Sequence, residues 1–411
     1  MLTAEKNELL TRVGPGTPMG SLLRRYWFPI AAAVELERWP TKKVRLLGED
    51  LVLFRDFSGR LGLLEEQCPH RRASLVYSIV DDEGVRCAYH GWKFDCEGRC
   101  LDMPPEPPET VLRERITTTA YRVQELGGLV WAYLGPEPAP VLPRYDLLVW
   151  DGALRDIGHA LLPCNWLQIM ENSMDPHHVE HLHGHYMGFL KHQSGETGPV
   201  VLPRKHEKIG FDLFEHGIIK RRVLVGGSED DEDWKIGHPL VFPCTLRVGS
   251  GGHYQFQFRV PVDDTHTWHV WYNTYKPEGV DVPRQDEIPL YEVPFLDERG
   301  DYILDFVDGQ DIMTWVTQGA IADRTRENLA RSDKGILLLR RVLEEEMEKV
   351  SRGEDPLAVV RTEHEVIELP QEVHKFLDGA GFRTEFLTLG QARYSPIRDQ
   401  VLKLFERVPA Q

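Results

Sequence analysis

Long hydrophobic runs are missing from this sequence of 411 residues. The longest apolar stretch near the N-terminus spans residues 27–34, contains Pro29 and is too short to cross a bilayer. Residues 1–13 mix polar and charged side chains, unlike the apolar core of a secretory signal. We therefore expect a cytoplasmic protein without a membrane segment.

Basic residues are also few relative to acidic ones. The 48 lysines and arginines face 65 aspartates and glutamates, which gives a formal net charge of −17. Binding to a phosphate backbone needs clustered lysine and arginine, so this balance argues against nucleic acid as a partner. A negative surface instead suits a positively charged protein partner.

Cysteine is scarce as well, with six residues in the chain. In a long chain without an export signal, these cysteines are better explained as metal ligands or buried thiols than as disulfides. The Gly-x-Gly-x-x-Gly fingerprint of nicotinamide and flavin sites does not occur. The sequence therefore shows no nicotinamide or flavin fingerprint of its own.

The length suits two domains, each with its own core. Short β-like runs separated by turns occur within residues 44–65 and resume at 128–134. The proline-rich segment 135–140 blocks both helix and central strand, so we place a domain boundary there. Residues 1–40 are expected to form a helical segment that packs on the second domain, and 41–140 a small all-β domain.

The second domain, 141–411, is predicted to be α+β. Residues 168–185 have a helical pattern, whereas 253–262 and 267–275 alternate in the manner of a half-buried antiparallel sheet. We expect helices to cover this sheet.

Two cysteines and two histidines form the first constellation. Cys68-Pro69-His70 is followed after sixteen residues by Cys87-Ala88-Tyr89-His90. Two thiolates and two imidazoles suit either tetrahedral zinc or a [2Fe–2S] cluster with both histidines on one iron. Each short loop supplies one cysteine and one histidine, whereas zinc fingers usually pair like with like, so the spacing favours the cluster.

The segments CPHRRASL (68–75), CAYHGWKFD (87–95) and GGLVWAYLGP (127–136) resemble the N-terminal domain of Rieske oxygenases. The resemblance implies that Cys68, His70, Cys87 and His90 hold a Rieske [2Fe–2S] cluster, and that the second domain has a helix-grip-like fold with a mononuclear iron. Arg72 departs from the pattern, because many members have glycine there. The resemblance gives Cys96 and Cys100 no cluster role.

Four histidines within seven residues form the second constellation. Regular helical geometry pairs His177 with His181, because residues four apart share a face, while His178 and His183 lie about 140° apart on an ideal helix. Rieske oxygenases, however, have Asp-x-x-His-x-x-x-x-His, which only Asp175, His178 and His183 satisfy. The resemblance thus implies that His178 and His183 are iron ligands and that the helix between them is distorted, near Pro176.

An oxygen-activating iron(II) of this kind also needs one carboxylate ligand. Downstream candidates are Asp305, Asp308, Asp311, Asp323 and Asp333. The sequence around Asp311 resembles the helix that carries the carboxylate ligand of the family, so Asp311 is the expected third ligand.

The resemblance also implies a role for Asp175 and an oligomeric state. The chain is similar to the phthalate dioxygenase-like group, including 5,5′-dehydrodivanillate O-demethylases, in NELLTRVGPGTPMGSLLRRYW (7–27) and VRLLGEDLVLFRD (44–56). In this family the equivalent acid links an iron-ligand histidine to a cluster histidine of the next subunit. Asp175 would then hydrogen-bond His178 and a neighbouring chain's His90 in a homotrimer, or in a hexamer of two trimers. A helix-capping acid is the alternative.

The implied reaction uses O2 and electrons from NAD(P)H, delivered by a separate reductase or ferredoxin, to hydroxylate a small aromatic acid. We expect monooxygenation that removes an aryl methoxy methyl group, with cis-dihydroxylation of the ring as the alternative. Two other classes remain open: a Rieske electron carrier, which leaves the second constellation unused, and a zinc hydrolase built on His177 and His181, which leaves the first unused.

Overall fold

A computed structural model describes residues 1–195, 205–372 and 387–408. The chain forms two compact units, Val13–Leu142 and Met1–Arg12 together with Pro143–Gln411. The segment 1–40 that we expected as one piece is therefore divided between the units. Its first twelve residues belong with the larger unit, where α1 (Ala4–Thr11) packs near α5 (Trp166–Ser173) and α9 (Lys334–Ser351). The remainder joins the smaller unit because strand β1 (Trp27–Ala32) pairs with β10 (Leu129–Tyr133).

The smaller unit is built on a six-stranded antiparallel sheet in the order β1-β10-β9-β4-β3-β2. The other strands of this sheet are β2 (Thr41–Leu46), β3 (Glu49–Arg55), β4 (Leu61–Glu65) and β9 (Ala120–Leu126). Two short helices, α2 (Pro18–Leu23) and α3 (Ala33–Arg38), flank β1 in the sequence. The predicted β runs before residue 66 and at 128–134 thus lie in one sheet.

A second, four-stranded sheet carries the Cys/His loops. Its strands are β5 (Ile79–Asp81), β6 (Gly84–Arg86), β7 (Lys93–Phe94) and β8 (Cys100–Asp102), paired in sequence order. One motif loop lies between β4 and β5, ahead of the short helix η1 (Leu75–Tyr77), and the other connects β6 to β7. A second short helix, η2 (Leu112–Arg115), follows β8. Phe54, Phe94 and Trp92 pack in a core that also contains both motif cysteines, so the loops are anchored from within.

An eight-stranded sheet forms the centre of the larger unit, in the order β12-β13-β14-β15-β16-β17-β11-β18. The strands are β11 (Leu154–Leu162), β12 (His206–Phe214), β13 (Gly217–Leu224), β14 (His238–Val241), β15 (Thr245–Ser250), β16 (His253–Pro261), β17 (Thr267–Tyr275) and β18 (Leu290–Glu292). All pairs are antiparallel except β11 with β18. β16 and β17 are the two strands that the alternating pattern predicts.

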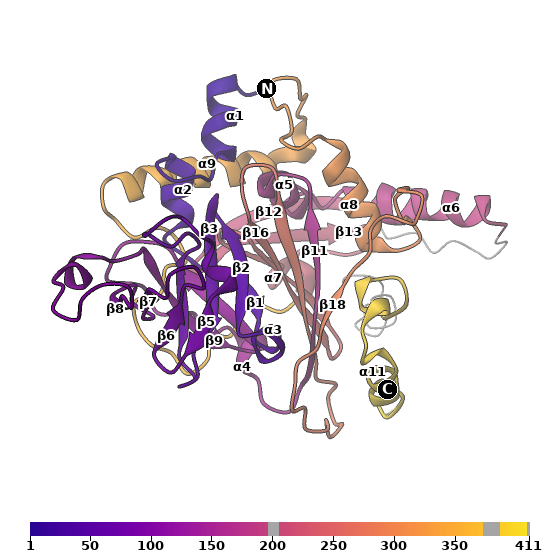
Figure 1. Cartoon of the computed structure of the whole chain (residues 1–411). Helices are drawn as coiled ribbons and strands as arrows, with labels where there is room; N and C mark the ends of the chain where they lie inside the picture. The colour runs from indigo at the N-terminus through magenta and orange to yellow at the C-terminus, as the bar shows by residue number, and fades with distance from the viewer. Residues whose placement is uncertain (196–204, 373–386, 409–411) are drawn as a thin grey trace. The chain divides into compact units, whose positions relative to one another are not determined.

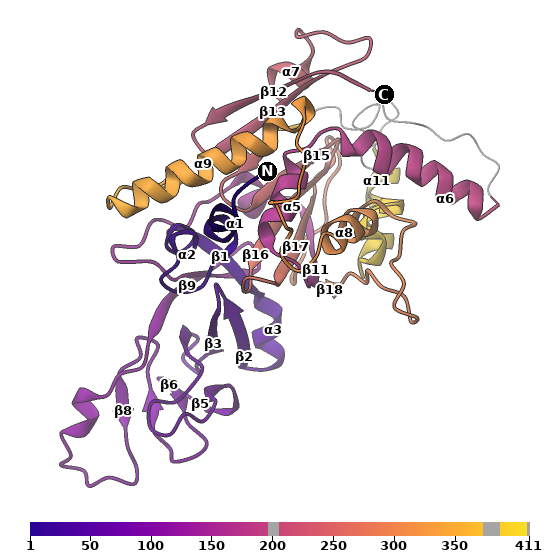
Figure 2. The same cartoon turned by 90° about the horizontal axis from the view of Figure 1, so that it is seen from above.

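Helices cover one face of this sheet (Figures 1 and 2). Besides α1, α5 and α9, the described part of this unit contains the helices and helical turns α4 (Asp146–Val149), η3 (Val179–Tyr186), α6 (Met187–Gln193), α7 (Glu232–Lys235), α8 (Val307–Thr317), η4 (Arg331–Asp333), η5 (Gln391–Tyr394) and α11 (Arg398–Glu406). Ile169 of α5 and Trp315 of α8 pack on Trp271 of β17, while Phe405 of α11 packs on Tyr275. Residues 271 and 275 point to the same side of a strand, so these helices share a face. The prediction of an α+β chain with a helix-covered antiparallel sheet is confirmed.

None of the helices in the described ranges combines the length and the apolar character that crossing a bilayer requires.

Candidate metal centres

The two Cys/His loops have the same backbone turn. The Cys68 carbonyl accepts the Arg72 N–H and the Cys68 N–H donates to the Ala73 carbonyl, both at 2.9 Å. In the second loop the Cys87 carbonyl accepts the Gly91 N–H and the Cys87 N–H donates to the Trp92 carbonyl, again at 2.9 Å. Each cysteine is therefore fixed by two main-chain bonds to residues four and five positions later.

Arg72 occupies the position that Gly91 holds in the other loop. Both residues have left-handed backbones, with φ of 61° at Arg72 and 76° at Gly91. Arginine in this conformation costs about 1 kcal/mol more than glycine, and its guanidinium forms an ion pair with Glu65 at 2.6 Å. The departure from the family pattern leaves the turn intact.

The four motif side chains form a consistent donor set. Cys68 and Cys87 are buried, and the imidazole rings of His70 and His90 meet edge to face at 4.5 Å. Burial, with a smaller contribution from Cys87, raises the pKa of the Cys68 thiol to about 11, and a bound iron would offset this by stabilising the thiolate. Trp92 stacks on His70 at 4.4 Å. The two cysteine sulfurs are buried and the two histidines are partly exposed, an arrangement that fits a [2Fe–2S] cluster.

Cys96 and Cys100 have contacts of their own. The Cys96 thiol lies 3.9 Å from a carboxylate oxygen of Asp56, and that of Cys100 lies 3.6 Å from the Asp102 carbonyl. Neither belongs to the two turns.

The histidine-rich segment contains a π-helix. Helix α5 ends at Ser173, and after a short turn η3 continues as a π-helix over Val179–Tyr186. Because a π-helix bonds residue i to i+5, it widens the turn and brings residues five apart toward one face. The predicted distortion between His178 and His183 is confirmed.

His178, His183 and Asp311 come together on η3 and α8. Asp311 Oδ1 lies 3.2 Å from His183 Nε2 and 3.7 Å from His178 Nε2. One ligand atom from each of the three residues lies within 4.8 Å of the other two. Two imidazole nitrogens and one carboxylate oxygen at this spacing fit a divalent iron with open positions.

The other ring nitrogens of both histidines are held by acceptors. His178 Nδ1 donates to the main-chain carbonyl of Asp175 at 2.6 Å, and His183 Nδ1 to the Gln310 side-chain carbonyl at 3.1 Å. These bonds leave each Nε2 to face Asp311, as in histidine metal sites generally. Burial lowers the pKa of His178 to about 4, against the opposing effect of Asp311, so the ring is neutral at neutral pH.

The remaining candidate acids have other partners. Asp308 accepts the Trp271 indole N–H and the Gln391 main-chain N–H, each at 2.8 Å, and burial raises its pKa to about 6. Asp305 pairs with Arg393, and Asp323 and Asp333 accept hydrogen bonds from residues two or three positions away. Of the five, Asp311 is the one that faces the two histidines.

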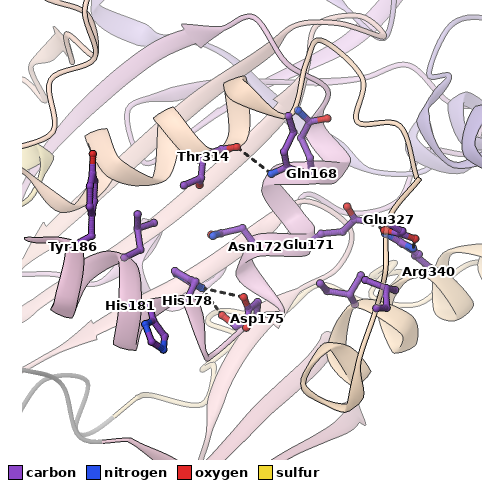
Figure 3. A pocket seen from close by; sticks show the side chains of 14 residues that line it. Gln168, Glu171, Asn172, Asp175, His178, His181, Tyr186, Thr314, Glu327 and Arg340 are labelled. Carbon is purple, nitrogen blue, oxygen red and sulfur yellow. Dashed lines mark hydrogen bonds and ion pairs between the residues drawn. The ribbon is translucent and has the colours of Figure 1, made fainter. Parts of the chain in front are cut away.

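The contact between Asp175 and His178 differs from the expected one. His178 bonds to the main-chain carbonyl, while the nearest Asp175 carboxylate oxygen lies 3.9 Å away (Figure 3). The carboxylate instead accepts the His177 main-chain N–H at 2.8 Å. The expected side-chain bond to His178 is therefore corrected: the carboxylate accepts a main-chain N–H in the turn before η3, and the main-chain carbonyl of the same residue orients the histidine.

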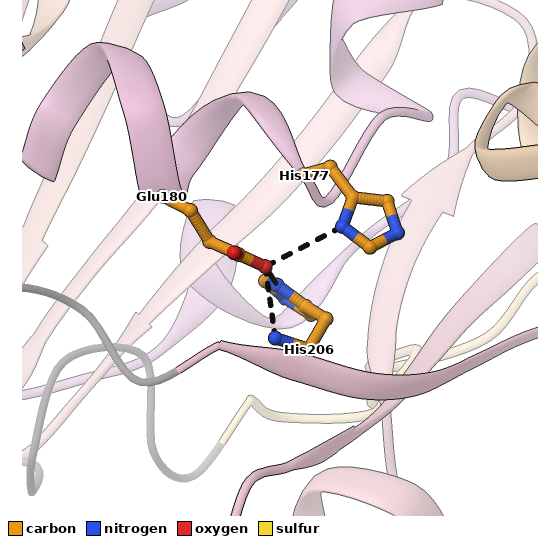
Figure 4. A group of neighbouring side chains, drawn as sticks. All are labelled: His177, Glu180 and His206. Atoms are coloured by element: carbon orange, nitrogen blue, oxygen red, sulfur yellow. Dashed lines mark hydrogen bonds and ion pairs between the residues drawn. The ribbon is translucent and has the colours of Figure 1, made fainter. Parts of the chain in front are cut away.

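The pairing of His177 with His181 does not form. His177 lies beside Glu180 and His206 (Figure 4), and the His181 ring faces His185 at 5.1 Å. Regular α-helical geometry predicted the wrong pair because the segment is not an α-helix.

His178 lines two hollows. One, of about 540 Å³, lies along α5 and η3 and is lined by Asp175, His178 and Tyr186 among others (Figure 3). The second contains His178, His183 and Asp311 and is also lined by Lys220, Arg222 and Arg259 from the sheet. No motif or spacing in the sequence points to these cationic residues.

Arg259 is unusual among them. It is 1% exposed, and its guanidinium donates to the side-chain and main-chain oxygens of Gln257 at 2.7 and 2.9 Å. Its Nε has no hydrogen-bond partner within the described part of the chain. Burial lowers the pKa of Arg259 to about 9, although Asp311 raises it. A positive charge is thus enclosed beside the triad.

Comparison with known proteins agrees with this geometry. Residues 26–122 match the Rieske [2Fe-2S] domain, and 298–376 match the domain described as LigXa C-terminal domain like. The chain is 43% identical over 398 residues to the 5,5'-dehydrodivanillate O-demethylase oxygenase subunit of Sphingobium sp. (strain NBRC 103272 / SYK-6), covering 95% of this chain and 92% of the relative. It is 32% identical to the phthalate 4,5-dioxygenase oxygenase subunit of Pseudomonas putida, covering 87% and 89%.

The fold has a similar solved structure in Pseudomonas putida CBB5 NdmA, with a TM-score of 0.62, 18% identity and coverage of 85% of this chain and 99% of that one. Fold and donor sets together define an oxygenase that joins an iron–sulfur domain to a mononuclear iron domain. The chain belongs to the Rieske non-haem iron oxygenases, within the group of the phthalate dioxygenase and 5,5'-dehydrodivanillate O-demethylase oxygenase subunits. Its cofactors are a Rieske [2Fe–2S] cluster and a mononuclear iron, and a separate reductase supplies its electrons.

Proposed function

We propose that this oxygenase removes the methyl group of an aryl methoxy substituent on an aromatic acid. The enclosed positive charge of Arg259 beside His178, His183 and Asp311 carries the proposal, because a buried guanidinium offers a carboxylate a charge-assisted hydrogen bond. The sequence identity of 43% to an O-demethylase oxygenase subunit supports the choice of reaction.

In this proposal, Cys68, His70, Cys87 and His90 hold the cluster, and His178, His183 and Asp311 hold the iron. Iron bound there would supply O2 activation, with electrons that arrive through the cluster. Asp175 and Gln310 keep the imidazoles oriented through their bonds to each Nδ1. Arg259 holds the carboxylate of the substrate.

The overall step is the hydroxylation of the methoxy carbon. Substrate, O2, two electrons and two protons give the hydroxymethyl ether and water, and that hemiacetal collapses to a phenol and formaldehyde. NAD(P)H provides the two electrons through the reductase.

The expected assembly is a homotrimer, or two trimers paired into a hexamer, in the cytoplasm. Asp175 would link the iron side of one subunit to His90 of the next, which gives the electron a short route between the two metal centres.

The test is turnover with a reductase, NADH and a panel of methoxylated and unsubstituted aromatic acids. Stoichiometric formaldehyde with the matching phenol is expected. A cis-diol without formaldehyde would instead identify ring dihydroxylation, which the phthalate 4,5-dioxygenase relative makes the second candidate.

A further inference from the structure

His177, Glu180 and His206 form a second group of ligand side chains in the larger unit (Figure 4). His177 lies in the turn before η3, Glu180 in the first turn of η3, and His206 is the first residue of β12. The group therefore connects the histidine-rich helix to the edge strand of the sheet.

The donor atoms converge on one carboxylate oxygen. Glu180 Oε1 lies 2.7 Å from His206 Nδ1 and 3.4 Å from His177 Nδ1, and one donor atom from each residue lies within 4.8 Å of the other two. The two imidazole rings meet edge to face, with centroids 5.2 Å apart. This is the same donor set, two imidazoles and one carboxylate, as that of His178, His183 and Asp311.

The charge at this position suits a cation. The Glu180 side chain is 12% exposed, and no lysine or arginine of the described ranges forms an ion pair with it. Arg222 lies near His206, but its guanidinium pairs with Asp233 at 3.0 Å and with Glu372 at 3.1 Å. Among the described residues, the hydrogen-bond partners of this largely buried carboxylate are the two imidazoles and the main-chain N–H of His206. A divalent ion would compensate the negative charge of Glu180 more fully than these donors do.

A purely structural role, in which Glu180 holds β12 by hydrogen bonds, explains only part of this group. Glu180 accepts both the main-chain N–H and Nδ1 of His206, which suffices to hold β12. It does not require His177, whose Nδ1 is too far for a good hydrogen bond and whose side chain is 35% exposed. A partly exposed third donor is what a metal site with water in its open positions needs.

We propose that His177 Nδ1, a carboxylate oxygen of Glu180 and His206 Nδ1 form a second site for a divalent transition metal, separate from the iron triad. Imidazole and carboxylate donors suit zinc and its first-row neighbours. Because His177 and Glu180 flank His178 in the sequence, an ion there fixes the chain on both sides of an iron ligand and ties it to β12.

Zinc is the probe. The holoenzyme, with its cluster intact, is titrated with zinc, freed of excess metal, and analysed for zinc and iron per chain. We expect one zinc per chain, and the same in His183→Ala, which lacks a complete triad. In both backgrounds Glu180→Gln, which preserves the shape of the side chain, should weaken zinc binding by more than about 100-fold, because loss of an outer partner alone costs roughly 10- to 100-fold.

His181→Ala is the matched control, since His181 lies on the same π-helix but outside the group. It should bind zinc like the wild type. Folding of every variant is checked by the cluster absorbance, and X-ray absorption at the zinc edge should show two imidazoles. Equal zinc binding in the wild type, Glu180→Gln and His206→Ala would overturn the proposal, as would loss of zinc only in His183→Ala. Zinc counts do not depend on the substrate, so this test is independent of O-demethylation.

Discussion

The cluster loops and the iron triad hold their ligands in different ways. In the loops, each cysteine is fixed by main-chain bonds to residues four and five positions later, so the geometry is set within six residues. In the triad, His178 is oriented by the residue three positions earlier, but His183 depends on Gln310 and Asp311 of α8, more than 120 positions away. The loops therefore depend on local backbone, whereas the triad depends on the packing of α8 against η3.

The largest effect is expected from Asp311→Asn. Loss of the carboxylate removes a ligand charge from the triad and should abolish iron binding and turnover, while the cluster absorbance and its paramagnetic resonance signal stay unchanged. Iron per chain, counted separately from cluster iron, is the measurement. A variant that keeps both its mononuclear iron and its activity would show that another acid is the ligand.

Gln310→Leu tests whether the triad depends on α8 beyond its ligand. Without the acceptor for His183 Nδ1, the affinity for iron should fall about 10- to 100-fold. The control is Gln318→Leu, an exposed residue at the end of the same helix that bonds to the Thr314 carbonyl. Iron affinity in Gln310→Leu equal to that of Gln318→Leu and of the wild type would mean that His183 does not depend on Gln310 for its orientation.

Arg259→Met tests the positive charge that β16 places beside the triad. Loss of one charge-assisted hydrogen bond costs about 1.5–3 kcal/mol, so KM for an aromatic acid should rise by one to two orders of magnitude, with a smaller change in kcat. Arg259→Lys should restore part of the loss, and the methyl ester of the substrate should be insensitive to both changes. If acid and ester respond alike, Arg259 serves folding and not the carboxylate.

The smallest effect is expected from Arg72→Gly in the local loop. Relief of the left-handed backbone, about 1 kcal/mol, is offset by loss of the exposed Glu65 pair and by the greater freedom of glycine in the unfolded chain. The free energy of unfolding should change by less than about 1 kcal/mol, and the cluster spectrum should not change.

Gly91→Ala is the mirror variant. A Cβ at Gly91 would lie 3.0 Å from Pro104 in addition to the unfavourable φ, so this change should destabilise the cluster unit measurably. If Arg72→Gly and Gly91→Ala change the free energy of unfolding by the same amount, the left-handed residue does not have the same importance in the two turns.

Whether a ligand is held by nearby or by distant residues also determines whether the sequence could predict it. Cys68, His70, Cys87 and His90 follow from spacing, since the turns that hold them are local. The five-residue separation of His178 and His183 correctly implied a distorted helix, because no regular α-helix places that pair on one face. Asp311 came from resemblance, and the structure singles it out only through its distance from the two histidines.

Other features depend on pairings between distant segments. Arg259 of β16 and Lys220 of β13 both lie beside the triad because the sheet, with β14 and β15 between them, carries both strands past it. His206 reaches Glu180 across 26 residues. Residues 27–32 belong to the smaller unit because Trp27 pairs with Tyr133, and nothing in the local pattern near residue 40 reveals that partner.

The π-helix changes how this region responds to a change in chain length. Its wider turn contains one residue more per hydrogen-bonded ring than an α-helix, so removal of a single residue between His178 and His183 would let η3 close into regular α-helical turns. The two histidines would then be four apart and still share a face, and the side chains of α6 would keep nearly the same orientation, because the residue removed is the one that widens the ring. Removal of one residue from η3 should therefore be tolerated by both the iron ligands and the packing that follows them, whereas the same change in the regular helix α9 would rotate every later side chain by about 100°.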